Sequence, residues 1–165
     1  MKSVVIAGYA RSPFCFASKG ELAKVRPDDM AAAVVRALVE RTKVNPDDIE
    51  DLILGCAFPE GEQGLNVARQ VGFLAGLPNS VPAMTINRFC SSGLQATAIV
   101  ADRITAGSID AGLAGGLESM SLVPMGGSKI ALNPAVVEQF PEAYIPMGNT
   151  AENVARQFGV SREQQ

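Results

Sequence analysis

Apolar runs and helical periodicities alternate along most of the chain. Four short apolar runs bounded by turn residues predict buried strands, at residues 3–7, 52–54, 81–86 and 109–113. Three segments with helical spacing of apolar side chains predict helices, at residues 27–43, 66–75 and 92–106. Strands that alternate with helices are typical of an α/β fold with a mostly parallel sheet, built from right-handed crossovers.

Residue types at the helix ends support these assignments. Pro27 suits the first turn of a helix, where its missing N–H costs no hydrogen bond. Asn66 is expected to cap the second helix, and Gly76 is expected to end it. Asn45 and Pro46 form another helix-start signal, which predicts a short turn before the second strand.

The third helix has apolar side chains around its whole circumference. Its strongly polar residues are Gln95, Asp102 and Arg103. A helix that is apolar all round is buried on all sides. We therefore expect this helix to lie between two layers of secondary structure. A chain of this length is too short to supply both layers.

The chain changes character after Ser119. Prolines and glycines interrupt a long irregular segment, too long for an ordinary connection. Asn149 and Glu152 then form a capping pair, which predicts a helix that runs through Phe158. Residues 161–164 form another capping box, and the chain stops one residue later. This pattern predicts the N-terminal part of a larger protein.

Composition and charge narrow the classes of function. The chain is 47% hydrophobic and 19% charged, and its net charge of −3 gives no reason to expect nucleic acid or a membrane as a partner. No segment is long enough to span a membrane. The three cysteines, Cys15, Cys56 and Cys90, lack metal-ligand spacing, so we expect reduced thiols, no metal and a cytoplasmic location. The sequence has no histidine, which excludes a histidine base from this chain.

Cys90 is the candidate nucleophile. It lies between the predicted third strand and the following helix, whose first backbone N–H groups carry positive partial charge. These groups favour the thiolate and can hold the oxyanion that forms when a thiolate attacks a carbonyl. The alternative is a small buried side chain at a tight turn, but the polar neighbours in residues 87–92 favour the chemical role. Cys56 is interpreted as packing.

The stretch around Cys90 resembles a known signature. Residues 87–96, NRFCSSGLQA, resemble the nucleophile signature of thiolases, the acyl-CoA C-acyltransferases. Four further stretches agree with that family in the same order, at residues 11–14, 66–70, 114–121 and 147–155. Together the five stretches run through nearly the whole chain.

The resemblance implies a fold and a division of the chain. Residues 1–118 would form the N-terminal half of a layered αβα thiolase fold, and residues 119–165 would begin an inserted loop domain that covers the pantetheine arm of coenzyme A. Met147 would line the acyl-pantetheine cavity, with a core methionine as the alternative. A homodimer or homotetramer is implied, completed by the C-terminal half of the same protein.

The resemblance also implies an activity. Thiolases cleave a 3-ketoacyl-CoA to acetyl-CoA and a shortened acyl-CoA, or run the reverse condensation, through an acyl-cysteine that Cys90 would form. Coenzyme A is a substrate, and no bound cofactor is implied. The family's histidine base and second cysteine come from the C-terminal half, so we expect this chain alone to lack turnover. The residues around Cys90, and Pro146 before Met147, resemble degradative enzymes for longer acyl groups.

Two other functions stay open at this point. A non-catalytic, thiolase-like subunit that binds acyl-CoA or acts as a scaffold has the same fold, although the retained Cys90 argues against it. A ketosynthase of the same superfamily ranks last, because the stretches at residues 114–121 and 147–155 resemble thiolases rather than ketosynthases.

Overall fold

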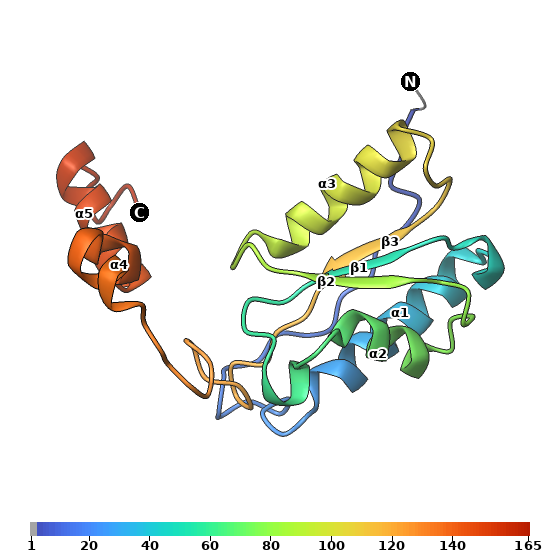
Figure 1. Ribbon diagram of the computed structural model, residues 1–165, viewed down its shortest axis with the longest axis horizontal. Coiled ribbons are helices and arrows are strands. Elements are labelled where there is room, and N and C mark those ends of the chain that lie inside the picture. Colours follow the sequence, from blue (N-terminus) through green and yellow to red (C-terminus); the bar gives the residue numbers. More distant parts are fainter. Residues whose placement is uncertain (1–2) are drawn as a thin grey trace. The chain divides into compact units, whose positions relative to one another are not determined.

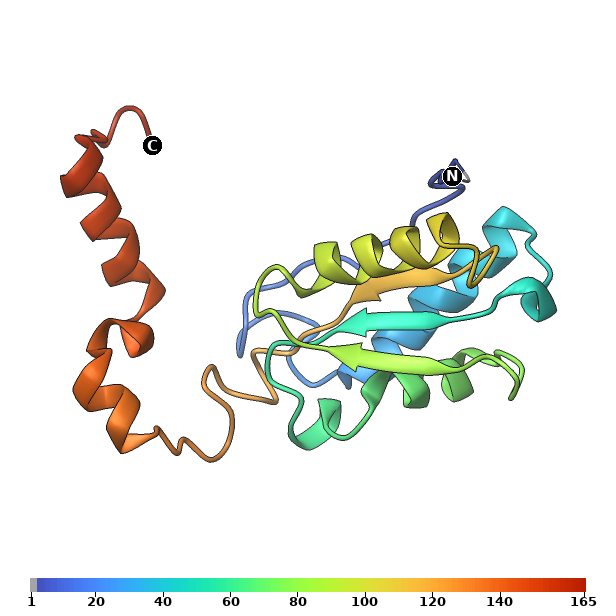
Figure 2. The ribbon, with the colours of Figure 1, turned by 45° about the horizontal axis from the view of Figure 1, so that its top comes forward.

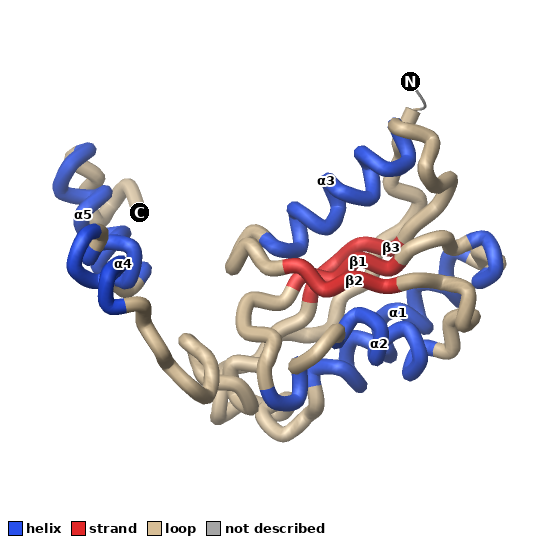
Figure 3. Tube along the Cα trace, viewed as in Figure 1, coloured by secondary structure: helices blue, strands red, loops and turns tan. Residues whose placement is uncertain are grey.

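A three-stranded parallel sheet is the centre of the first part of the chain. In the computed structural model, which describes residues 3–165, β1 (Leu52–Gly55) lies between β2 (Ala83–Ile86) and β3 (Leu113–Gly116). The strands are drawn in red in Figure 3. All four residues of β1 are buried, as expected for the middle strand of a sheet that is covered on both faces.

The strands end level with one another. In the register of the sheet, Gly55 of β1 is opposite Ile86 of β2 on one side and Gly116 of β3 on the other. Because all three strands run in the same direction, the segments that follow them meet at one edge of the sheet.

Helices cover both faces of this sheet. The helices α1 (Pro27–Thr42) and α2 (Val67–Ala75) lie on one face, and α3 (Ser92–Thr105) lies on the other, as Figures 1 and 2 show. The alternation of side chains along β1 produces two cores. Leu52 and Leu54 pack with α1 and α2, whereas Ile53 packs with the inner face of α3.

In the first part of the chain, the helix ends follow the sequence signals with one exception. Pro27 is the first residue of α1, and Gly76 ends α2 with a φ of 79°, in the left-handed region. Asn45 caps a short 3₁₀ turn, Pro46–Asp48, by accepting from the N–H of Asp47. Asn66 occupies the N-cap position of α2 without capping it. Its side chain bonds to β2 instead, because that strand lies within reach.

Two predicted strands differ from the structure. Residues 3–7 form no strand and are exposed, because no strand lies beside them among the described residues and an extended segment needs a partner for its hydrogen bonds. The strand expected at 109–113 is shifted to Leu113–Gly116. Ile109 is buried, but it lies in the loop before the strand. The two glycines that weaken the strand pattern at 115–116 are paired with β1.

The helix α3 is buried on one face only. Ser92, Ala96 and Val100 face the sheet, while Leu94 is 77% exposed. The expectation of burial on all sides is therefore not met in this chain. The reason is that the described residues place a sheet against only one side of the helix.

A second compact unit comprises Lys129–Gln165. It contains α4 (Pro134–Gln139), a 3₁₀ turn (Pro141–Tyr144) and α5 (Met147–Phe158), none of which has a buried residue. The helix α5 begins before Asn149, with Pro146 at its N-cap, so the predicted capping by Asn149 is wrong. A proline with extended backbone already starts the helix there.

The last predicted capping box is confirmed as a local structure. The N–H of Ser161 donates to the side chain of Gln164, and the N–H of Gln164 donates to the hydroxyl of Ser161. This reciprocal pair is the arrangement that the sequence pattern predicts. The compact units divide after Ser128, whereas the domain boundary expected after Glu118 stays a prediction.

Within residues 3–165, no helix combines the length and the apolar character that crossing a membrane requires.

Candidate active site

Three chain segments converge at the carboxyl edge of the sheet. They are residues 56–58 after β1, residues 87–91 after β2 and residues 117–119 after β3. Backbone hydrogen bonds hold them together, from the N–H of Cys56 to the carbonyl of Ile86 (3.0 Å) and from the N–H of Leu117 to the carbonyl of Gly55 (3.0 Å). Open α/β folds bind their ligands at this edge.

Cys90 lies in the turn that connects β2 to α3, two residues before the helix begins, and its side chain is exposed. The location expected from the sequence is therefore the one that the structure has. Ser91, the N-cap residue, makes no capping hydrogen bond with its side chain. The backbone N–H groups at the start of α3 can thus stabilise negative charge that develops near Cys90.

The turn before Cys90 has an unusual backbone conformation. Phe89 has a φ of 47°, in the left-handed region that bulky residues rarely adopt. Ser92, which is almost fully buried, bonds to this turn at two points. Its hydroxyl donates to the carbonyl of Phe89 (2.6 Å) and accepts from the N–H of Arg88 (2.8 Å). These bonds hold a conformation that is unfavourable by itself.

Asn87 holds the same turn from the other side. Its Oδ1 accepts from the N–H of Phe89 (2.8 Å), and its Nδ2 donates to the carbonyl of Ala57 (2.9 Å) in the segment after β1. One side chain therefore connects the turn that carries Cys90 to the neighbouring chain segment.

Glu118 organises that neighbouring segment. Its carboxylate accepts from the N–H groups of Ala57 (2.7 Å) and Phe58 (3.3 Å), and from Nε2 of Gln63. Gln63 is fully buried, and its own oxygen accepts from the N–H of Ser119 (2.9 Å). A carboxylate is suited to this position because it only accepts hydrogen bonds, and several donors point at it.

Cys56 is a packing residue, as the sequence predicts. Its side chain is 1% exposed, and its Sγ lies 3.7 Å from a carboxylate oxygen of Glu118. Burial, and then the negative charge of Glu118, raise the pKa of the Cys56 thiol to about 12. Cys56 therefore stays a neutral thiol, whereas Cys15 and Cys90 are exposed.

Glycines let the start of α3 approach the sheet closely. A Cβ atom on Gly55 would lie 2.4 Å from Cβ of Ser92, a distance that real side chains do not reach. A Cβ atom on Gly93 would lie 3.8 Å from the backbone of Gly115, in ordinary contact. The missing side chain of Gly55 allows Ser92 to reach the turn.

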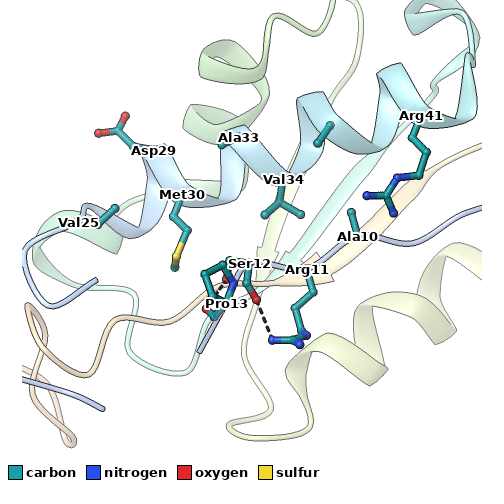
Figure 4. A pocket seen from close by; sticks show the side chains of 11 residues that line it. Ala10, Arg11, Ser12, Pro13, Val25, Asp29, Met30, Ala33, Val34 and Arg41 are labelled. Atoms are coloured by element: carbon teal, nitrogen blue, oxygen red, sulfur yellow. Dashed lines mark hydrogen bonds between the residues drawn. The ribbon is translucent and has the colours of Figure 1, made fainter. Parts of the chain in front are cut away.

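A separate cavity of about 400 Å³ lies on the outer side of α1. Figure 4 shows Met30 and Val34 of α1 on one side of it, with Ser12 and Pro13 of the N-terminal segment opposite. None of the residues that line it belongs to the three segments around Cys90. This cavity is therefore distinct from the candidate site.

Met147 lies in the second unit, as the first residue of α5, and its side chain is 68% exposed. The alternative of a core methionine is not met within that unit. Its predicted role in substrate binding stays a proposal.

Sequence reasoning did not single out Glu118 and Gln63. Glu118 falls within the stretch 114–121 that carries the resemblance, but no local pattern predicts its hydrogen-bond partners, which lie more than fifty positions away. The signal that the sequence does contain is a charged residue two positions after a strand that ends in two glycines.

These features define a parallel α/β domain with an exposed thiol at a strand-to-helix turn, on the edge where such folds bind ligands. The chain belongs to the thiolase family: the family model described as the N-terminal domain of thiolase matches residues 4–165. This match confirms the resemblance and the α/β fold class.

Curated relatives agree with this assignment. The chain is 54% identical over 165 residues to a 3-ketoacyl-CoA thiolase of Bacillus subtilis (strain 168), in an alignment that covers 100% of this chain and 42% of that protein. It is 44% identical over 164 residues to peroxisomal 3-ketoacyl-CoA thiolase 2 of Arabidopsis thaliana. This alignment covers 98% of this chain and 35% of that protein. The chain thus spans between 35% and 42% of the length of these two relatives.

Proposed function

We propose that the chain is the N-terminal part of a thiolase, which transfers acyl groups between coenzyme A thioesters through an acyl-cysteine at Cys90. The observation that carries this proposal is the exposed thiol of Cys90 at a clamped strand-to-helix turn, in a chain of the thiolase family. The printed names of the relatives, 3-ketoacyl-CoA thiolases, support a 3-ketoacyl-CoA as the substrate.

The reaction has two halves. The Cys90 thiolate attacks the 3-keto carbonyl, and the bond between C2 and C3 breaks with its electron pair on C2, which takes up a proton to give acetyl-CoA. The thiol of a second coenzyme A then attacks the acyl-cysteine, releases the shortened acyl-CoA and returns the proton to the site. Covalent catalysis suits this transfer because the acyl group stays an activated thioester throughout. The N-terminal end of α3 can stabilise the oxyanion that forms in each half.

We expect the general acid and base to come from outside these residues. The reaction needs a base to activate Cys90 and an acid for the carbanion. The sequence has no histidine and no cysteine after Cys90. We therefore expect that the histidine and the second cysteine come from a C-terminal half and that this chain alone has no turnover.

Further expectations belong to the same proposal. Met147 is expected to contact the acyl-pantetheine arm, and the degradative signature favours longer acyl groups. A homodimer or homotetramer is expected in the cytoplasm, with coenzyme A as substrate rather than resident cofactor, and without a bound metal.

Acylation tests the proposal directly. The full-length polypeptide is incubated with an acyl-CoA, and mass spectrometry locates the acyl adduct. We expect an adduct on the peptide that contains Cys90, and none in Cys90→Ser. If coenzyme A binds but no adduct forms, the chain belongs to a non-catalytic subunit that binds acyl-CoA or acts as a scaffold.

A further inference from the structure

We propose that Asn87 is a positioning residue that sets the direction of Cys90, and that Glu118 fixes the chain segment to which Asn87 is anchored. This inference rests on the proposed function of Cys90. Both residues act through the backbone of the turn that carries Cys90.

The first step is the backbone of Phe89. Its left-handed φ of 47° determines the direction in which the chain leaves toward Cys90, the next residue. An aromatic residue adopts this conformation only where its surroundings hold it there. The Oδ1 of Asn87 holds it by accepting from the N–H of Phe89 at 2.8 Å. Asparagine is suited to this local bond because its side chain reaches the backbone two residues further on.

The second step is the anchor across the sheet edge. The Nδ2 of Asn87 donates to the carbonyl of Ala57 at 2.9 Å, so both polar atoms of the side chain are bonded. The rings of Phe58 and Phe89 also contact each other, with centroids 6.1 Å apart and planes tilted by 52°. The segment 56–58 therefore holds the turn in place through one hydrogen bond and one ring contact.

The third step is the support of that segment. Both Ala57 and Phe58 donate their N–H groups to Glu118, and Gln63 donates to the same carboxylate. Gln63 also donates to the carbonyl of Phe58 at 2.9 Å. The segment is thus fixed by hydrogen bonds from the end of β3, and a neutral amide at position 118 would turn a donor toward groups that are themselves donors.

Loss of Asn87 removes the bond that favours the left-handed conformation of Phe89. The turn then relaxes, and the Sγ of Cys90 moves relative to the N-terminal end of α3. A displacement of about 1 Å at a reacting atom costs on the order of 100-fold in rate. Ser92 holds the turn at its other end, so the protein stays folded.

The experiment uses the full-length polypeptide with four variants. Asn87→Ala removes both bonds, and Asn87→Ser keeps a short acceptor for the N–H of Phe89 without adding charge. Glu118→Gln weakens the support. Glu50→Gln is the matched control, because Glu50 also accepts backbone N–H groups, from Asp110 and Ala111, but at the opposite end of the strands.

Two quantities are measured besides thermal stability: kcat/KM for thiolysis, and the time course of Cys90 alkylation by iodoacetamide at neutral pH. We expect Asn87→Ala to lower kcat/KM by about 10- to 100-fold, through kcat rather than KM. We also expect it to slow the alkylation of Cys90, because the thiol loses its position at the N-terminal end of α3. Asn87→Ser should recover part of both effects, because it keeps an acceptor for Phe89 but loses the bond to Ala57. Glu118→Gln should show a smaller version of the effects of Asn87→Ala, and Glu50→Gln should show neither.

The inference is overturned if Asn87→Ala has the wild-type kcat and the wild-type time course of alkylation. It is also overturned if Glu50→Gln loses activity and thermal stability to the same extent as Asn87→Ala, because the losses then reflect stability alone. The failure of the proposed function looks different. In that case the wild-type protein forms no acyl adduct on Cys90, while the alkylation profiles of the same variants still decide whether Asn87 positions the thiol.

Discussion

At the scale of single residues, two thiols of one chain have opposite environments. Cys90 is exposed in a turn at the end of a helix, while Cys56 is enclosed beside the carboxylate of Glu118. Removal from water disfavours the charged form of a thiol, and a nearby negative charge disfavours it further. The surroundings rather than the residue type therefore decide which cysteine is available for chemistry.

The raised pKa of Cys56 predicts its reactivity and its effect on stability. With a pKa of about 12, Cys56 should resist iodoacetamide at pH 8 in the folded protein and react after unfolding, when the pKa returns to about 9.0.

A folded pKa above the unfolded value contributes stability that is complete below pH 9 and is lost as the pH rises toward 12. Cys56→Ala should therefore lose less stability than the wild type between pH 9 and 11. Peptide mass spectrometry and unfolding curves measure both effects, and equal labelling of Cys56 and Cys90 at pH 8 would contradict the assignment.

Cys90→Ser tests the role of the exposed thiol. The change replaces one small side chain by another at an exposed position, so the free energy of unfolding should change by less than about 0.5 kcal/mol. Thiolysis in the full-length polypeptide should fall to the background rate, because a serine hydroxyl near neutral pH is a much weaker nucleophile than a cysteine thiol. Full activity in this variant would refute the assignment of Cys90.

At the scale of elements, glycines explain why the sequence pattern predicts β3 at the wrong position. The pattern favours Ile109–Leu113, which contains two large apolar side chains, while the observed strand ends in Gly115 and Gly116. Glycine lowers the intrinsic preference for a strand. In the fold, both glycines pair with β1, and this long-range pairing outweighs the local preference.

Gly55→Ala tests the close approach of α3 to β1. The added methyl group would lie 2.4 Å from Cβ of Ser92 and 2.6 Å from its carbonyl carbon, so α3 has to move. We expect a loss of about 1–3 kcal/mol in the free energy of unfolding. Gly148→Ala is the control, because nothing lies within 4 Å of the added atom and alanine favours α5 by about 0.5–1 kcal/mol. Denaturant unfolding compares the two, and an equal effect would show that α3 is not pressed against β1.

At the scale of the whole molecule, the chain leaves large apolar side chains uncovered. In the first unit they include Leu94 on the outer face of α3, and Val5 and Ile6, each 80% exposed. In the second unit, the apolar residues of α4 and α5 are uncovered as well. Exposed apolar surface of this kind marks sites where other protein surfaces bind.

The isolated chain of 165 residues should therefore associate with itself. We expect it to bind a hydrophobic dye and to elute from a sizing column above 17.3 kDa, because association removes the exposed apolar surface from water. The full-length polypeptide should bind less dye per mole, and the isolated chain should show no thiolysis. A monomer that binds no dye would contradict this interpretation of the surface.

The sequence by itself determined the features that depend on neighbours in the chain. The start of α1 at Pro27, the end of α2 at Gly76 and the location of Cys90 before α3 follow from local residue preferences. These preferences act within one or two turns of backbone, so the residues in order are sufficient to predict them.

Only the tertiary structure decided which distant residues meet around Cys90. The pairing of β3 with β1, the bond from Asn87 to Ala57 and the bonds from Glu118 to the segment after β1 join positions that are about thirty to sixty residues apart. No local preference encodes such a contact, because its energy appears only when the sheet brings the strand ends together.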